Sequence, residues 1–153
     1  DSMGLACLDS ACPHCRRKLP PGFLDIPNHI ISIVGAPASG KSYYISTLIK
    51  GLASTLYRDF KITFRDGDPS GNLVLNDMKN RLFSAQTPEE AFLLKTVLGG
   101  GITYERLPRN GREVDLPKPF VYELSPLQNA DDCRSIILYD NAGEHFKPNV
   151  SLD

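Results

Sequence analysis

The run of eight residues at 35–42, Gly-Ala-Pro-Ala-Ser-Gly-Lys-Ser, constrains the fold of this chain more than any other feature. It fits the pattern G-x-x-x-x-G-K-[ST] at every fixed position. A short β-branched apolar run at 29–34 precedes it, and apolar residues recur at helical spacing over 43–56. The sequence therefore predicts a strand, a glycine-rich turn and a helix in direct succession, with the strand buried on both faces as in a parallel sheet.

This pattern has a chemical meaning, because its glycines let the backbone turn tightly and bring successive N–H groups against phosphate oxygens. Lys41 would reach β- and γ-phosphates as a point charge, and the Ser42 hydroxyl would coordinate Mg²⁺. Tyr43 is interpreted as helix packing whose ring could also approach a nucleotide. A chance glycine turn is the alternative, and the flanking patterns disfavour it. The candidate nucleotide-binding residues are Gly35, Ala36, Pro37, Ala38, Ser39, Gly40, Lys41, Ser42 and Tyr43.

A second apolar run, at 136–139, leads into the sequence Asp-Asn-Ala-Gly-Glu at 140–144. An Asp at the end of a buried strand is what such a loop needs for a further contact to Mg²⁺, so Asp140 is the second candidate magnesium ligand. Gly143 can offer its backbone N–H to a γ-phosphate with no side chain in the way. An ordinary Asp-Asn turn after a strand is the alternative.

Besides the run at 29–34, three stretches have the alternation and β-branched content of strands, at 60–64, 120–124 and 135–139, the last of which includes the second apolar run. Turn-forming residues lie between the last two stretches, which predicts that they pair as an antiparallel hairpin. Together with the glycine turn and its helix, these strands predict an α/β fold.

Two additional helices are predicted. Apolar residues form a loose stripe over 73–83, and Thr87 followed by Pro88 has the chemistry of a helix N-cap and first helical position. The second of these helices would end at the glycines at 99–101. The polar stretch from there to residue 119 contains further Gly and Pro residues and predicts a long loop.

The N-terminal segment, residues 1–27, carries a Cys-Pro-His-Cys sequence at 12–15. Two thiolates two residues apart can grip one tetrahedral Zn²⁺, so Cys12 and Cys15 are candidate zinc ligands, with Cys7 as a possible third. A redox pair and uncoordinated thiols are the alternatives. The chain is thus divided into a candidate zinc knuckle with its linker and a nucleotide-binding domain at 28–153.

The composition of the chain argues against two classes of binding partner, nucleic acids and membranes. The 153 residues are 41% hydrophobic and 23% charged, with a formal net charge of -1, so the charge balance offers no support for nucleic-acid binding. No apolar run approaches the roughly 18–20 residues that span a bilayer, so no membrane partner is expected. The N-terminus lacks the pattern of a signal peptide, and a cytoplasmic location is the expectation.

The G-x-x-x-x-G-K-S sequence followed by D-x-x-G resembles the Ras-like, translation-factor class of P-loop GTPases. The Cys-Pro-x-Cys knuckle ahead of it, with Asp-Asn-Ala-Gly-Glu at the second motif, resembles bacterial proteins of the double-GTPase type. The resemblance covers about residues 29–145. It implies a P-loop NTPase fold with a mixed sheet and helices on both faces, and Mg²⁺-dependent binding of GTP and GDP with slow hydrolysis.

By this resemblance, Glu144 stands where Ras-like proteins keep a glutamine that orients water. A carboxylate can accept a hydrogen bond from water but cannot donate one as an amide does, which implies slow hydrolysis assisted by His145 or by a protein partner. Lys41 and Glu144 are therefore the candidate catalytic residues. A Glu144 side chain that points to solvent is the alternative.

The sequence departs from the family in three respects. The guanine-reading N-K-x-D is absent, and ATP is therefore not excluded. Ten residues follow Gly143, too few for the remaining strands, so the domain is expected to be incomplete at its C-terminus. The threonine that would bind Mg²⁺ from the first switch has no recognisable context; Thr103 is the candidate, because Thr87 is better explained as an N-cap.

Three functions remain open at this stage. The first is a GTPase that acts as a regulatory switch. The second is an ATPase or small-molecule kinase, for which the loop carrying Arg106, Arg109 and Arg112 is the candidate basic lid. The third is a scaffold that binds nucleotide without turnover and works through its zinc knuckle and helical insertion.

Overall fold

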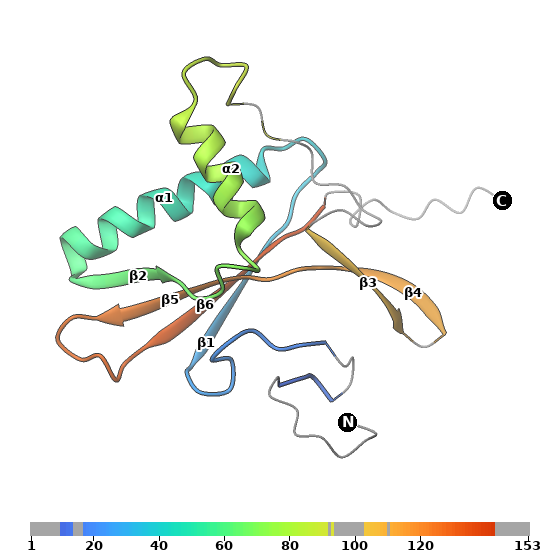
Figure 1. Ribbon diagram of the computed structural model, residues 1–153, viewed down its shortest axis with the longest axis horizontal. Coiled ribbons are helices and arrows are strands. Elements are labelled where there is room, and N and C mark those ends of the chain that lie inside the picture. Colours follow the sequence, from blue (N-terminus) through green and yellow to red (C-terminus); the bar gives the residue numbers. More distant parts are fainter. Residues whose placement is uncertain (1–9, 14–16, 92, 94–102, 110, 143–153) are drawn as a thin grey trace.

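The computed structural model describes residues 10–13, 17–91, 93, 103–109 and 111–142, and these form a mixed α/β structure (Figure 1). The elements in chain order are β1 (Asn28–Ile33), α1 (Lys41–Phe60), β2 (Ile62–Asp66), α2 (Leu73–Ser84), β3 (Tyr104–Arg109), β4 (Arg112–Pro117), β5 (Phe120–Pro126) and β6 (Arg134–Asp140). The predicted succession of strand, glycine turn and helix is confirmed by β1 and α1.

Four strands form a mixed sheet in the order β1-β6-β5-β2. The predicted hairpin is confirmed, because β5 and β6 pair antiparallel, with Phe120 opposite Leu138. β1 and β6 are parallel, with Ile33 opposite Asp140. The carboxyl ends of β1 and β6 therefore lie side by side. The residues that follow these two strands are placed next to each other.

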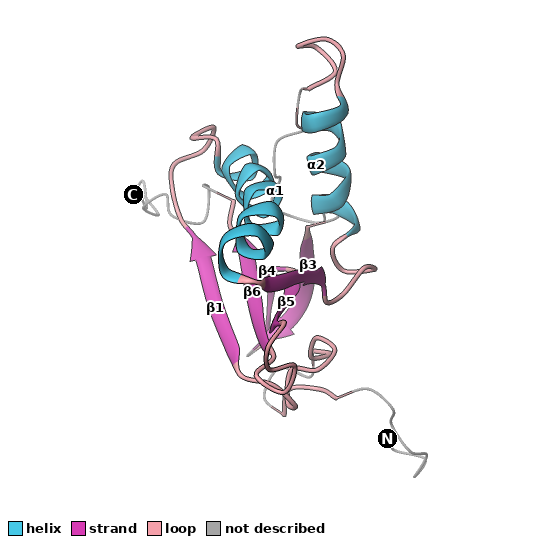
Figure 2. Ribbon diagram, turned by 90° about the vertical axis from the view of Figure 1, so that its left-hand side faces the viewer, coloured by secondary structure: helices cyan, strands magenta, loops and turns pink. Residues whose placement is uncertain are grey.

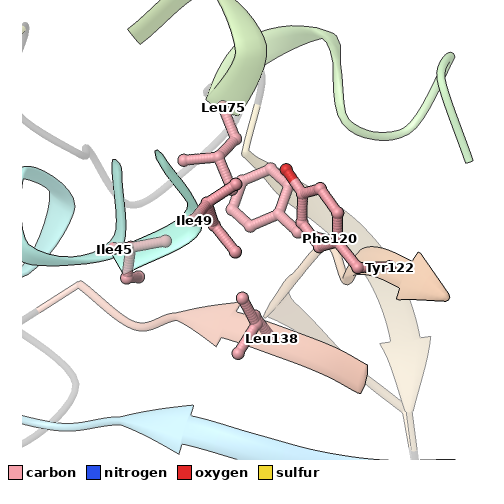
Figure 3. Packing of buried hydrophobic residues seen from close by; sticks show 6 residues of the cluster. All are labelled: Ile45, Ile49, Leu75, Phe120, Tyr122 and Leu138. Atoms are coloured by element: carbon pink, nitrogen blue, oxygen red, sulfur yellow. The ribbon is translucent and has the colours of Figure 1, made fainter. Parts of the chain in front are cut away.

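Both helices of the described chain cover the same face of the sheet (Figure 2). The core brings together side chains from both helices and from β5 and β6 (Figure 3): Ile45, Ile49, Leu75, Phe120, Tyr122 and Leu138. Within the described residues, the expectation of helices on both faces is therefore wrong. The periodicity of a helix says which of its faces is apolar but not which face of a sheet it will cover.

Strand β1 is more exposed than its composition suggested. It pairs with β6 on one side and is an edge of the described sheet, with Ile30 60% and Ile31 43% exposed. The prediction of a strand buried on both faces is wrong for these side chains, because an apolar run reports hydrophobicity and not the number of neighbours that the strand acquires.

The first helix is longer than expected and takes in Phe60, which had been predicted to open a strand. It ends at Lys61, whose φ of 57° lies in the left-handed region and whose N–H donates to the Leu56 carbonyl as a C-cap. Strand β2 then begins at Ile62.

The predicted long loop before Pro119 is wrong, because β3 and β4 form a two-stranded antiparallel ribbon there, with Arg109 opposite Arg112. The two residues between these strands are Asn-Gly, and Gly111 has a φ of 74°. Asn-Gly between two extended runs is the strongest short-range signal of a hairpin, and the surrounding charges and prolines obscured it.

The helix predicted to start at Thr87 is not formed over 87–91, which are turns. The Thr87 hydroxyl still accepts a hydrogen bond from the Glu90 N–H, as an N-cap side chain does three residues ahead. Apart from Leu93, the remaining positions of this predicted helix lie outside the described residues.

Neither α1 nor α2, the two helices in the described ranges, combines the length and apolar character that crossing a bilayer requires.

The start of α2 is held by one buried amide. Asn72 is fully buried, and its Nδ2 donates to the Val121 carbonyl while its Oδ1 accepts from the Val121 N–H at 2.8 Å. The same Nδ2 also donates to the carboxylate of Asp66 at the end of β2. One side chain therefore ties α2 to β2 and β5, and it gives the buried Val121 N–H of β5 an acceptor.

Candidate phosphate-binding site

The glycine loop, residues 35–42, runs from the end of β1 into the first turn of α1. Ala38 and Gly40 both adopt left-handed backbone conformations, with φ of 59° and 82°. At Gly35, an added Cβ would lie 3.0 Å from the Ser39 hydroxyl oxygen, a tight contact that the Ser39 side chain would have to relieve. Gly40 is the N-cap of α1 and provides no side-chain hydrogen bond, so backbone N–H groups at the helix N-terminus can donate hydrogen bonds to an anion.

The Lys41 ammonium folds back over the glycine loop. Its Nζ donates to the Gly35 carbonyl at 3.0 Å and to the Ala36 carbonyl at 2.8 Å. The positive charge is therefore held directly above the loop backbone, in the position from which it can neutralise an anion that the loop binds.

Ser42 and Asp140 lie 98 positions apart in the sequence and meet in the structure, where the Ser42 hydroxyl donates to Asp140 Oδ2 at 2.6 Å. The parallel pairing of β1 with β6 brings them together, because α1 begins just after β1 and Asp140 ends β6 (Figure 1). Asp140 is only 4% exposed. A hydroxyl and a carboxylate are hard oxygen donors that suit Mg²⁺, so this donor set fits the metal that the sequence predicts.

The two described residues after β6, Asn141 and Ala142, are held by two side chains that sequence reasoning missed. Asn141 Nδ2 donates to the Ser32 hydroxyl at 2.6 Å and so pins the loop to β1. The buried Ala142 N–H donates to the Tyr104 hydroxyl at the start of β3. Tyr104 gave no signal in the sequence, because its role depends on a ribbon that had been predicted to be a loop.

Two other predicted residues lie in the described part of the chain near these elements. Thr103 is 9% exposed, and its carbonyl accepts from the Lys118 N–H at the base of the β3–β4 ribbon. The Tyr43 hydroxyl accepts from the Leu93 N–H at 3.0 Å, so this side chain contacts protein backbone. Magnesium binding by Thr103 and nucleotide contact by Tyr43 stay predictions.

Gly143, Glu144 and His145 lie outside the described residues, so their predicted roles stay predictions.

The basic lid predicted for a kinase is not a loop. Its Arg106 belongs to β3, and the Arg106 Nε lies 2.9 Å from Oδ1 of Asp115 in β4. This carboxylate raises the pKa of Arg106 and holds its guanidinium on the ribbon.

In the N-terminal segment, the described residues on the two sides of positions 14–16 contact each other. The Cys12 N–H donates to the Arg17 carbonyl at 2.8 Å, and Ala11 forms a bridge with Lys18. Cys7 and Cys15 lie outside the described residues. Within the described ranges, no three His, Cys, Asp or Glu side chains gather as a metal-binding group, and zinc binding stays a prediction.

The left-handed Ala38 gives a test of strain in the glycine loop. We expect Ala38→Gly to raise the free energy of unfolding by about 0.5–1 kcal/mol, because glycine adopts this backbone without a steric penalty. Ala36→Gly is the matched control in the same loop, since Ala36 does not have a positive φ, and it should lower stability slightly. Urea denaturation measures both; equal effects of the two changes would contradict strain at Ala38.

Comparisons with family models, with curated proteins and with solved structures find no match for this chain.

Proposed function

We propose that this chain is a P-loop NTPase that binds GTP and GDP with Mg²⁺ through the glycine loop and hydrolyses GTP slowly as a regulatory switch. The observation that carries the proposal is the hydrogen bond between Ser42 and Asp140. A serine directly after a glycine loop and an aspartate at the end of the neighbouring parallel strand are the two protein groups that this class of site uses around its metal.

Three features of the same region support phosphate binding. The loop backbone turns through the left-handed residues Ala38 and Gly40 into the N-terminus of a helix of 20 residues. The helix dipole and its N–H groups favour an anion at this end. The Lys41 ammonium lies over the same loop and adds a full positive charge.

Ser42 and Asp140 are the residues that would hold Mg²⁺, with Thr103 as a further candidate. When bound, the ion neutralises charge that develops on the phosphate oxygens. The Asp140 carboxylate at the end of β6 accepts a hydrogen bond from the Ser42 hydroxyl. The Asn141 side chain, directly after β6, donates a hydrogen bond to Ser32 of β1. These contacts join the Ser42 and Asp140 side chains and hold Asn141 against β1.

The preference for GTP and the slow turnover rest on the sequence alone, through the D-x-x-G spacing and Glu144. An ATPase or kinase would need a basic lid, and the pairing of Arg106 with Asp115 gives that alternative no support. A nucleotide-binding scaffold without turnover, with zinc held by Cys12 and Cys15 and with Cys7 as the candidate third ligand, differs from the switch only in phosphate release.

The test compares the affinities for GTP, GDP and ATP with and without Mg²⁺ and then measures phosphate release. We expect Asp140→Asn to remove most of the gain in GTP affinity that Mg²⁺ provides, a loss of about 10- to 100-fold, because the amide keeps the shape but loses the charge. The exposed Asp77 on α2 supplies the matched control, Asp77→Asn, which should change nothing. A magnesium effect of unchanged size in Asp140→Asn would overturn the metal site.

A further inference from the structure

The base of the β3–β4 ribbon lies at the same end of the sheet as the candidate phosphate-binding site. Two residues separate the end of β4 from the start of β5. β5 begins with Phe120, which pairs with Leu138 near the end of β6. Because β5 runs antiparallel to β6, the chain enters β5 where β6 finishes (Figure 1). The ribbon therefore starts beside the residues that follow β6.

Tyr104 joins this ribbon to the chain after β6. It is the first residue of β3 and is 3% exposed, and its hydroxyl accepts a hydrogen bond from the Ala142 N–H. Ala142 is itself 1% exposed, so solvent does not reach this N–H as an alternative acceptor. A buried N–H that loses its acceptor costs free energy. The Tyr104 hydroxyl therefore favours one position of the main chain at Ala142.

Ala142 stands between two residues that the proposed function uses. Asp140, two positions earlier, is a candidate magnesium ligand and accepts a hydrogen bond from Ser42. Gly143, the next residue, lies outside the described residues, and its predicted role is to offer its N–H to a γ-phosphate. Consecutive Cα atoms are about 3.8 Å apart across a planar peptide. A displacement of Ala142 therefore moves the point from which the chain continues to Gly143.

Arg17 braces the base of the ribbon from the N-terminal segment. Its Nε lies 3.1 Å from Oε2 of Glu105 in β3, and its Nη2 donates to the Pro117 carbonyl in β4 at 3.2 Å. Pro117 is the residue that pairs with Tyr104 in the ribbon. The Arg17 side chain is 16% exposed, so its charge is better shielded from solvent than that of an ordinary surface pair. One guanidinium thus holds both strands at the level of Tyr104.

We propose that Tyr104 is a positioning residue of the nucleotide site, which favours GTP over GDP by fixing the main chain at Ala142, and that Arg17 tunes this preference from the N-terminal segment. The inference rests on the proposed function, because it concerns the regulation of the same phosphate site. Release of the Arg17 contacts loosens the base of the ribbon and with it Tyr104, and the binding of GTP then weakens more than that of GDP.

Tyr104→Phe tests the positioning role, because it removes the hydroxyl and keeps the ring. In the presence of Mg²⁺, it should lower the ratio of GTP affinity to GDP affinity about five- to tenfold, since GDP lacks the phosphate that Gly143 is predicted to contact. Isothermal titration calorimetry measures both affinities. A tyrosine that only stabilised the fold would change Tm and leave this ratio as it is, so an unchanged ratio overturns the proposal.

Hydrogen exchange followed by NMR reads the contact itself, without nucleotide. In the full chain, the Ala142 amide should exchange about tenfold faster in Tyr104→Phe than in the wild type, because its N–H loses the hydroxyl as acceptor. The amide of Ile137, a buried residue in the middle of β6, is the reference for global unfolding. Equal acceleration at both amides would show a general loss of stability and contradict the positioning role.

Arg17→Met tests the brace while leaving the Tyr104 hydroxyl in place. It should lower the same affinity ratio about two- to fourfold, and in a double variant it should add nothing to Tyr104→Phe, since both act through one contact. Arg106→Met is the matched control, because Arg106 also pairs with a carboxylate of the ribbon, that of Asp115, but nearer the tip. It should leave the ratio unchanged.

Three results would overturn the role of Arg17: no effect of Arg17→Met, an equal effect of Arg106→Met, or fully independent effects in the double variant. If Tyr104→Phe does not fold, the ratio in Arg17→Met decides the proposal by itself. A wild type that binds neither nucleotide ends the proposed function, and this inference with it. A wild type that binds both and loses them in Lys41→Ala supports the nucleotide site, and the affinity ratios then decide this inference alone.

Discussion

Asn72→Ala should lower the free energy of unfolding by about 2–4 kcal/mol, the largest stability effect that we expect from one substitution in this chain. The Val121 N–H loses Asn72 Oδ1 as its acceptor and stays buried, whereas the Val121 carbonyl keeps the Gly67 N–H as a donor. The substitution also empties the volume of a fully buried side chain, which adds to the loss. Urea denaturation of the wild type and the variant measures the difference.

Two further variants identify the cause of that loss. Asn76→Ala removes one hydrogen bond to the same carboxylate of Asp66 at an exposed position, and it should cost less than about 1 kcal/mol. Asn72→Asp keeps an acceptor for the Val121 N–H but sets a second carboxylate against Asp66, so it should destabilise at neutral pH and recover part of the loss in acid. A cost at Asn72 no greater than that at Asn76 would contradict the role of Asn72 in joining α2 to the sheet.

Lys41→Ala should weaken the binding of GTP about 100-fold, because it removes the ammonium that lies over the glycine loop. The loss should be smaller for a nucleotide with fewer phosphates, since the lysine is expected to act on the β- and γ-phosphates. Isothermal titration calorimetry in the presence of Mg²⁺ measures both affinities.

Lys50→Ala is the matched control for Lys41→Ala, because it removes the same charge from the same helix about two and a half turns further on, where the side chain is exposed. It should leave GTP affinity unchanged. If Lys41→Ala keeps full affinity for GTP and ATP, the chain does not use the glycine loop for nucleotide, and the switch, kinase and scaffold hypotheses all fail together.

Local sequence was a reliable guide wherever the structure depends on neighbouring residues. Gly40 suits the backbone of the loop through its left-handed φ, and Gly35 leaves room for the Ser39 side chain. The helix that follows buries the apolar stripe that contains Ile45 and Ile49. These features follow from sterics and periodicity within a short stretch of chain, so the sequence contains the information needed to predict them.

The errors arose where structure depends on which segments meet. Asn-Gly at 110–111 signalled a hairpin, but the charged side chains that obscured it pair only after the strands align, as Arg106 does with Asp115. Ile30 and Ile31 are apolar and yet exposed, because β6 is the only neighbour of β1 in the described sheet. Neither outcome could be derived from local periodicity.

The sequence by itself determined the phosphate-loop motif, the helix after it and the aspartate that ends a later strand, because each depends on contacts between near neighbours in the chain. Only the tertiary structure decided that Ser42 meets Asp140, that Tyr104 contacts Ala142 and that Asn72 joins α2 to β5. These contacts join residues 38 to 98 positions apart. They form because the strands pair in one order and register, and that order is selected by packing of the whole core.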